Sequence, residues 1–573
     1  MTETPTNATP PPPPPPPPAA PTAAAAGGGK KGGAGKVIAG GIGAVLVGGA
    51  AVAGVVGYNT LSGGGAQPAD AMPSTFQFYA RVDLDPGASQ KVELFKLLNK
   101  VPELKELFGI DDPNKDDIRE LLFEQITQEC PDIDYAADVE PWLGDRVGFG
   151  GSIKSIENEE FEFLIAVQVK DEGKAEDGVA KLFDCSDEDY GIAFYNDYVL
   201  LSENQQDVDS MLQQAKDKSL AENEEFTKAT DALGEKGLAS AWVDAAGLLS
   251  MFKDIPGFTD ELPEEQLKQI EEAGSGAMAL RVAGSAIELA GVSTGEVQTL
   301  DGRSNIADLP EDTVAAISVT GVGEVIQDQW DLFVSSLESG FYDDLGDDVG
   351  SEFDDEFGDD LSDEFGDDFG SEFDDEFTDD FSAFSVPTPE EMIQAFEDET
   401  GLTLPEDLVS LMGQTFTLAI GSANLETIPY LQGPDDLEKL DVAIHTSDGD
   451  DGNAIDVMRK LADYATQNGI PLVAQETDSG AVLATSDSAA KAIADGGGLG
   501  SSDRFASVMP FGDQATFAFY LDISTAIEKI LAADPPQEIR DGVEQAKFVE
   551  AVGISAGNVD GHGKFSLRVS FAD

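Results

Sequence analysis

One order of strands and helices occurs twice in this chain, and this repetition is the feature that most constrains the fold. A stretch of alternating apolar and polar residues begins at Phe76 and continues to Leu84. Pro86-Gly87 ends it, and an amphipathic helix follows. The same strand-then-helix order recurs at 238–252, 313–333 and 515–531.

Other segments match in the same order along the chain. Trp142-Leu143-Gly144 and Leu411-Met412-Gly413 each lead into a glycine-punctuated strand, and the strand, loop and helix at 161–182 resemble those at 441–461. Each half closes with paired strands, at 277–292 and 552–571. We therefore predict an α+β fold with an internal duplication. Its halves, residues 72–302 and 307–573, would each be mainly antiparallel sheet with helices on one face.

The N-terminal region predicts a membrane anchor. Residues 1–36 contain an unbroken proline run and Gly-rich sequence, which is typical of a disordered tail. Residues 37–58 are then free of charge and long enough to span a bilayer as a helix. Small residues spaced by four within this span would also allow two copies to associate as a homo-oligomer. Residues 59–71 form a short linker.

The charges around this span predict its orientation. Lys30, Lys31 and Lys36 precede it, whereas the sequence beyond it is strongly acidic. The positive-inside rule places the tail in the cytoplasm and the C-terminal portion outside, in a single-pass plasma-membrane protein. A cleaved signal peptide is the alternative, with Ala69-Asp70-Ala71 as the cleavage site, but this site lies far beyond the apolar run.

The overall charge and the scarce reactive side chains exclude several functions. A formal net charge of −78 repels nucleic acid, so we expect no DNA or RNA partner. Only two histidines are present, which removes most routes to histidine-based chemistry. Cys130 and Cys185 are too few for a structural zinc site. They could form one disulfide outside the cytoplasm or remain two separate buried thiols.

An acidic insert at 341–383 interrupts the second half. Residues 343–380 contain 20 acids and no Lys or Arg. Apolar residues fall at every fourth position, so on a helix they would drift around the axis and form no single buried face. We interpret the insert as a disordered low-complexity loop. The alternatives are capture of a basic partner or weak calcium binding, for which the candidate ligands are Asp354, Asp355, Glu356, Asp359, Asp360, Asp374, Asp375 and Glu376.

The remaining motifs give no catalytic or cofactor-binding residue. Residues 291–295 match the G-x-S-x-G pattern of hydrolases, but the sequence that follows indicates a strand end and a turn where that motif needs a helix. An acidic loop at 448–453 lacks the glutamate that an EF-hand requires. We therefore expect a protein without enzymatic activity.

Two stretches resemble a known family. Tyr79-Ala80-Arg81-Val82-Asp83-Leu84-Asp85-Pro86 and the stretch from Glu140 to Gly148, preceded by a proline-rich tail and a short membrane segment, are similar to the DUF3352 family of uncharacterised, membrane-anchored bacterial proteins. The resemblance would extend over nearly all of the chain from residue 37, apart from the acidic insert. It implies location and architecture, and it implies no activity.

These observations favour a non-enzymatic binding or structural protein of the cell envelope with an unknown envelope partner. Two hypotheses stay open beside it, a carrier of a lipid or other apolar ligand and an envelope hydrolase that uses carboxylates. An apolar hollow would favour the carrier, and two facing buried carboxylates would favour the hydrolase.

Overall fold

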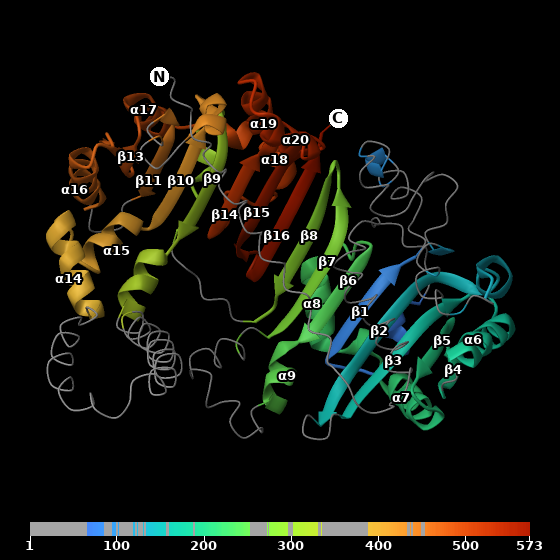
Figure 1. Cartoon of the computed structure of the whole chain (residues 1–573). Coiled ribbons are helices and arrows are strands. Elements are labelled where there is room, and N and C mark those ends of the chain that lie inside the picture. Colours follow the sequence, from blue (N-terminus) through green and yellow to red (C-terminus); the bar gives the residue numbers. More distant parts are fainter. Residues whose placement is uncertain are drawn as a thin grey trace, which may run out of the picture.

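A computed structural model of the whole chain (Figure 1) describes residues 66–84, 133–155, 160–186, 189–252, 274–295, 302–330, 388–431, 439–447 and 453–572, with isolated residues between these ranges. The predicted disordered tail, membrane span and acidic insert lie outside the described residues. Within the described part, no helix has the length and apolar character needed to cross a membrane.

Sixteen strands of the described residues form one antiparallel sheet. The first half contributes β1 (Phe78–Asp83), β2 (Leu143–Ser155), β3 (Glu160–Val169), β4 (Gly191–Tyr195), β5 (Tyr198–Ser202), β6 (Ala239–Asp244), β7 (Ser275–Ala283) and β8 (Ala286–Ser293). The second half contributes β9 (Thr313–Thr320), β10 (Thr415–Gly421), β11 (Val442–Ser447), β12 (Val473–Thr477), β13 (Gly480–Ala484), β14 (Phe517–Asp522), β15 (Val549–Val559) and β16 (His562–Phe571).

The strand order is the same in the two halves. From the outer edge inward, the first half runs β4-β5-β3-β2-β1-β6-β7-β8 and the second runs β12-β13-β11-β10-β9-β14-β15-β16. This common order is what the repeated sequence plan predicts. The halves meet where β8 pairs with β16, from Ser293 opposite Gly563 to Ala286 opposite Ser570, so they share a single sheet (Figure 1).

The two closing hairpins form because their turns accept left-handed backbone. Between β15 and β16, Asp560 and Gly561 have φ angles of 57° and 80°. Positive φ at both central residues is the requirement of a type I′ turn, whose twist matches that of the paired strands. The predicted Asp-Gly hairpin is therefore confirmed.

Helices follow the strands in matching places. They are η1 (Pro68–Ala71), η2 (Tyr135–Val139), α6 (Glu172–Ser186), α7 (Gln205–Asp217), η3 (Leu220–Glu222), α8 (Glu224–Leu233), α9 (Ala245–Phe252), η4 (Ile306–Asp308), α14 (Pro389–Thr400), α15 (Glu406–Met412), η5 (Leu425–Tyr430), α16 (Ala454–Gln467), α17 (Asp487–Asp495), η7 (Leu499–Ser501), α18 (Asp503–Val508), α19 (Ile523–Ala532) and α20 (Gln537–Gln545). Several begin at a side-chain cap, such as Asn204 for α7 and Ser486 for α17.

The sheet has helices on both faces, and the prediction of helices on one face is wrong. The two sides of β13 show this clearly. Leu483 packs in a cluster with Met458 of α16, whereas its neighbour Val482 packs with Ala490 of α17. Because adjacent side chains of a strand point to opposite faces, α16 and α17 lie on opposite sides of the sheet. All five residues of β13 are accordingly buried.

Candidate functional site

A single row of side chains, one from each strand, follows one face of the whole sheet. Directly opposite residues of an antiparallel pair share a face, so the strand register traces this row from edge to edge. It reads Ile192, Leu201, Ile165, Phe149, Ala80, Ala241, Met278, Gly291, Phe565, Ala556, Phe517, Val319, Phe416, Thr446, Ala481 and Glu476. No charged residue occurs in it until the last strand. We call this side of the sheet the apolar face.

The opposite side, which we call the covered face, holds the polar groups of the central strands. On β8, Glu288 is buried on the covered face, whereas Ile287 and Leu289 lie half-buried on the apolar face. On β1, Arg81 is 4% exposed on the covered face, whereas Phe78 and Ala80 are half-buried. A one-sided antiparallel sheet normally buries its apolar side chains and exposes its polar ones. In the centre of this sheet the arrangement is reversed, because these charged side chains are buried and their apolar neighbours are more exposed.

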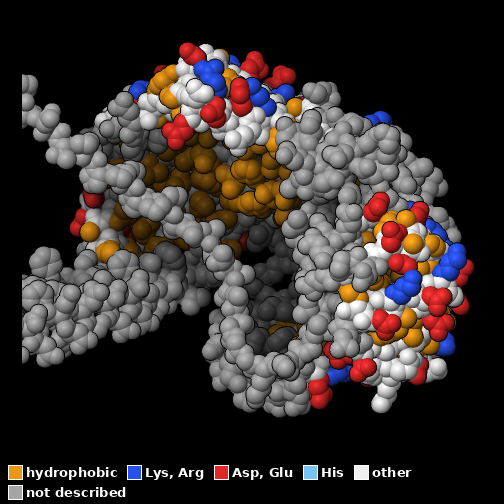
Figure 2. All heavy atoms as spheres, turned by 45° about the vertical axis from the view of Figure 1, so that its right-hand side comes forward, with side chains coloured by type: hydrophobic (Ala, Val, Ile, Leu, Met, Phe, Trp, Pro, Cys, Tyr) orange, Lys and Arg blue, Asp and Glu red, His pale blue; other side chains and the backbone are white. Residues whose placement is uncertain are grey.

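Two side chains of the apolar face are well exposed near the junction of the two halves. Met278 on β7 is 50% exposed and Phe565 on β16 is 37% exposed. They flank Gly291 of β8, where a Cβ atom would meet only atoms at ordinary contact distance. Figure 2 shows hydrophobic side chains gathered in a hollow of the surface. Exposed apolar surface of this kind is typical of a binding region.

The buried charges of the covered face neutralise one another. The carboxylate of Glu288 lies 2.6 Å from Arg281 Nε and 3.1 Å from Arg568 Nε, and it accepts a hydrogen bond from the Ser566 hydroxyl. Burial by itself raises the pKa of Glu288, but the hydrogen bond from Arg281 and the two guanidinium charges outweigh it and hold the pKa below its ordinary value. This network joins β7, β8 and β16 across the junction.

A second buried charge cluster lies on β1 and β2. Arg81 donates to Asp83 over 2.8 Å and to the Gln67 side chain over 2.6 Å, and Arg146 Nε lies 3.3 Å from Asp83. Burial raises the pKa of Asp83, although Arg81 and Arg146 both oppose the shift. Sequence reasoning missed this cluster because Arg81 and Asp83 occupy the polar positions of an alternating strand, which are ordinarily solvent-facing.

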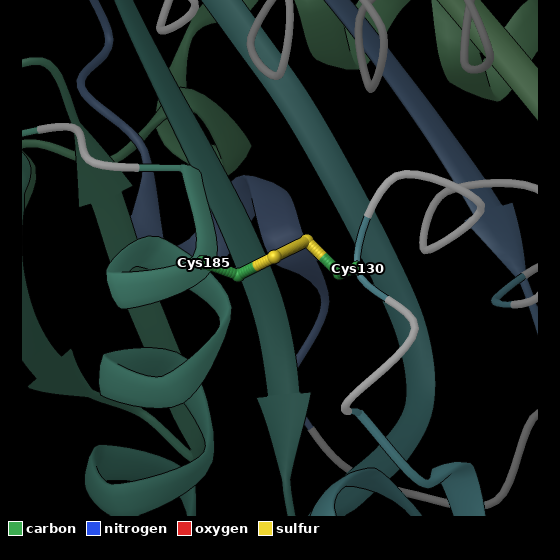
Figure 3. Close-up of a disulfide and its surroundings, with 2 residues drawn as sticks. All are labelled: Cys130 and Cys185. Carbon is green, nitrogen blue, oxygen red and sulfur yellow. A yellow bond between two sulfur atoms is a disulfide. The ribbon is translucent and has the colours of Figure 1, made fainter.

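The two cysteines form a disulfide in the structure. Cys130 and Cys185 have Cα atoms 6.0 Å apart, and the bond connects the segment before η2 to the end of α6 (Figure 3). The sequence left this pairing open beside two separate thiols. The bond closes a loop on the outer part of the first half, distant in the sheet order from the β8–β16 junction.

The other motifs found in the sequence form no shared site in the described residues. Ser293 of the G-x-S-x-G pattern is the last residue of β8, as expected for a strand end. His445 lies on β11 and His562 at the start of β16, on strands that are not neighbours. The calcium candidates, Asp354, Asp355, Glu356, Asp359, Asp360, Asp374, Asp375 and Glu376, lie outside the described residues. Within the described part, no cluster of three or more potential metal ligands occurs.

Comparison with known proteins gives one match. A family model described as "Protein of unknown function (DUF3352)" matches residues 39–349. This range covers the first half and the start of the second, so the match ends earlier than the sequence resemblance suggested. No curated protein and no solved structure matches the chain.

Proposed function

The chain belongs to the DUF3352 family of unknown function, and from this premise we propose that it is a membrane-tethered extracytoplasmic binding protein whose apolar face holds an apolar ligand with lipid-like acyl chains. This proposal combines the leading hypothesis from the sequence, a non-enzymatic binding protein, with the hypothesis of a carrier for an apolar ligand. The observation that carries it is the row on the apolar face, which is uncharged from β4 to β13, together with the exposure of Met278 and Phe565.

The free energy of burial supports an apolar occupant. Transfer of apolar surface out of water is favourable by about 25 cal/mol per Å². A charged or strongly polar ligand would lose its hydration against this face and find no ionic partner among the described residues of the central strands. A hydrocarbon chain has little hydration to lose. It gains contact with the flat rings of Phe side chains and with flexible Met side chains, which adapt to ligands of variable shape.

The predicted anchor supplies a nearby source of such ligands. The predicted span ends at residue 58, and the described fold begins at residue 66. Residues 59–65 connect the two, and seven extended residues reach at most about 25 Å. The sheet would therefore stay close to the outer surface of the bilayer. The net charge of −78 opposes direct binding to anionic headgroups, which favours capture of single lipid molecules over adhesion to the membrane.

The hydrolase hypothesis receives less support from the described residues. A carboxylate pair for general acid–base catalysis needs two carboxyl groups that face one another across a cleft. The buried acids Glu288 and Asp522 lie on β8 and β14, which are separated by two strands, and each pairs with arginine. Both carboxylates are thus held in ionic networks of the core.

Binding of the neutral fluorescent probe N-phenyl-1-naphthylamine to the full chain tests the proposal. Met278→Glu places a charge on the apolar face, and Gly291→Leu fills the gap beside Phe565 without adding charge. We expect each to weaken probe binding at least tenfold. Ile539→Glu is the control because Ile539 is 36% exposed on α20, outside the sheet. Equal probe affinity in the two sheet variants and the wild type would disprove the proposal.

Lipid analysis supplies a second readout. The full chain purified in a mild neutral detergent should retain acyl lipids that mass spectrometry detects, and Met278→Glu should retain fewer. Retention of lipid by Met278→Glu at the wild-type level would place the lipid elsewhere, such as on the predicted membrane span, and would count against the apolar face.

A further inference from the structure

The first half contains a small cavity whose charged lining is entirely cationic. It lies between η1, α8 and the covered face of β1 and β6. The lining residues are Gln67, Ala69, Tyr79, Arg81, Phe226, Thr230, Lys236, Ser240, Ala241 and Trp242. Two of these residues are cations and none is an acid, in a chain with 111 acids and 33 bases. Such a lining is unexpected for this composition.

Two buried N–H donors at this cavity have no acceptor among the residues that the structure describes. Arg81 is 4% exposed and Trp242 is 3% exposed, and Arg81 Nε and Trp242 Nε1 both lack a hydrogen-bond partner. The terminal nitrogens of Arg81 donate to Gln67, Asp83 and the Gly237 carbonyl. A buried donor without an acceptor costs about 1–3 kcal/mol, so two at one cavity indicate a missing acceptor.

The second cation at the site, Lys236, has no ion-pair partner among the described residues. It is half-buried at the cavity wall. Burial and then the Arg81 charge lower the pKa of Lys236, and Asp231, Asp70 and Asp83 oppose this shift without forming an ion pair with it. Among the described residues, Arg81 forms an ion pair with Asp83, which also pairs with Arg146. The residues that line the cavity therefore include two cations and no carboxylate.

The duplicated sheet does not require this cluster. Arg81 is the one charged residue in its row on the covered face. From the edge of the first half to the edge of the second, this row contains Ala193, Leu200, Ala166, Gly148, Arg81, Ser240, Ala279, Ala290, Ser566, Ser555, Ala518, Ser318, Thr417, His445, Val482 and Gln475. In the second half the positions of Arg81 and Trp242 hold Ser318 and Tyr520, and Ser318 is satisfied by a 2.9 Å hydrogen bond with Thr417. The scaffold forms there without a buried cation.

We propose that this cavity binds one small monovalent inorganic anion of the chloride class, held by Arg81, Trp242 and Lys236. The cavity volume is about 10 Å³, which leaves room for one monatomic particle and excludes phosphate and organic carboxylates. A halide accepts hydrogen bonds and donates none, so it matches a lining that offers unpaired donors. A halide also supplies a negative charge, which the lining lacks and which a water molecule does not provide. The site lies on the covered face and is independent of the ligand proposed for the apolar face.

The test is thermal unfolding of the full chain in a neutral detergent at constant ionic strength, with sodium chloride replacing sodium gluconate. Constant ionic strength is required because salt screens the self-repulsion of this acidic chain. If chloride binds only the folded state, each tenfold rise in chloride above the dissociation constant lowers the unfolding equilibrium constant about tenfold. Wild-type stability that does not change with chloride would overturn the proposal.

Two variants and one matched control localise the effect. Trp242→Phe keeps the ring and removes the N–H donor, and Lys236→Met removes the unpaired charge. Both should flatten the chloride dependence. Trp142→Phe is the control because Trp142 is equally buried, at 3%, but its Nε1 already donates to the Asp138 carbonyl over 2.6 Å. Trp142→Phe should lower stability equally in both salts and keep the wild-type chloride response. An unchanged response in Lys236→Met would contradict the proposal even if Trp242→Phe fails to fold.

Crystals of the full chain grown with sodium bromide give a direct readout. Anomalous scattering should place one bromide ion between Arg81 Nε and Trp242 Nε1. A water molecule with no anomalous signal at that position would show that the donors are hydrated and that no anion site exists.

Discussion

At the scale of single residues, the buried carboxylate at the junction of the halves has the largest expected effect on stability. Glu288 is 1% exposed between Arg281 and Arg568, so Glu288→Gln leaves two guanidinium groups without their counter-charge. Breaking a buried ion pair from one side costs about 3–5 kcal/mol. We expect a loss of this size in urea unfolding. Glu544→Gln is the control because its pair with Lys547 is half exposed, and it should change stability little.

The pH dependence of stability checks the same residue. Because the folded-state pKa of Glu288 is below its ordinary value of 4.5, its stabilising contribution is present above about pH 4.5 and is lost as the pH falls through the folded-state pKa. The difference in unfolding free energy between the wild type and Glu288→Gln should therefore shrink below pH 4.5. A difference that stays constant down to pH 2 would show that folding does not lower the pKa of this carboxyl group.

The alternating sequence predicted the strands better than it predicted their faces. Phe78, Ala80 and Val82 were recognised as one side of a half-buried strand, and β1 is confirmed. The pattern alone cannot show which side is covered. Here Tyr79 and Arg81 are the buried side chains, because Phe226 of α8 packs edge to face against Tyr79 and lines the cavity beside Arg81. Both candidate binding regions, the apolar face and the cationic cavity, depend on this reversal and were missed.

At the scale of elements, the disulfide fixes the end of α6. Cys130 and Cys185 are 55 residues apart in the sequence, and the chain-entropy estimate for closing such a loop is about 4 kcal/mol. We expect reduction with dithiothreitol to lower the unfolding free energy by up to this amount. The double variant Cys130→Ser with Cys185→Ser should unfold at the same denaturant concentration with or without reductant. If reduction leaves the wild type unchanged, the bond does not constrain the unfolded chain.

Elements with their own local signals could be predicted, and those that depend on neighbours could not. The hairpins at β7–β8 and β15–β16 and the helices α6 and α16 lie where turn residues and apolar periodicity placed them. The edge strands β4 and β12 were missed because each has five residues, too few to show a pattern. The positions of α16 and α17 on opposite faces follow from tertiary packing, which local periodicity does not encode.

At the scale of the whole molecule, the sequence predicted two similar halves but not their fusion into one sheet. Nothing in the sequence of β8 or β16 marks them as partners, since each reads as the second strand of its own hairpin. In the structure they pair from Ala286 opposite Ser570 to Ser293 opposite Gly563. The pairing removes the one inner edge that each half would otherwise expose, and unpaired inner edges promote association.

This arrangement predicts how the halves behave when they are separated. Residues 66–302 alone would expose the backbone donors and acceptors of β8, with Ile287 and Leu289 on one side and Glu288 on the other. We expect this fragment to self-associate, and to form a one-to-one complex when it is co-expressed with residues 303–573. Light scattering after size-exclusion chromatography measures both. Glu288→Arg in the first fragment should weaken the complex because it places three arginines together, and Arg568→Glu in the second fragment should restore part of the affinity. Two fragments that remain monomeric and do not bind would show that the β8–β16 pairing contributes little free energy of its own and that the covalent link holds the halves together.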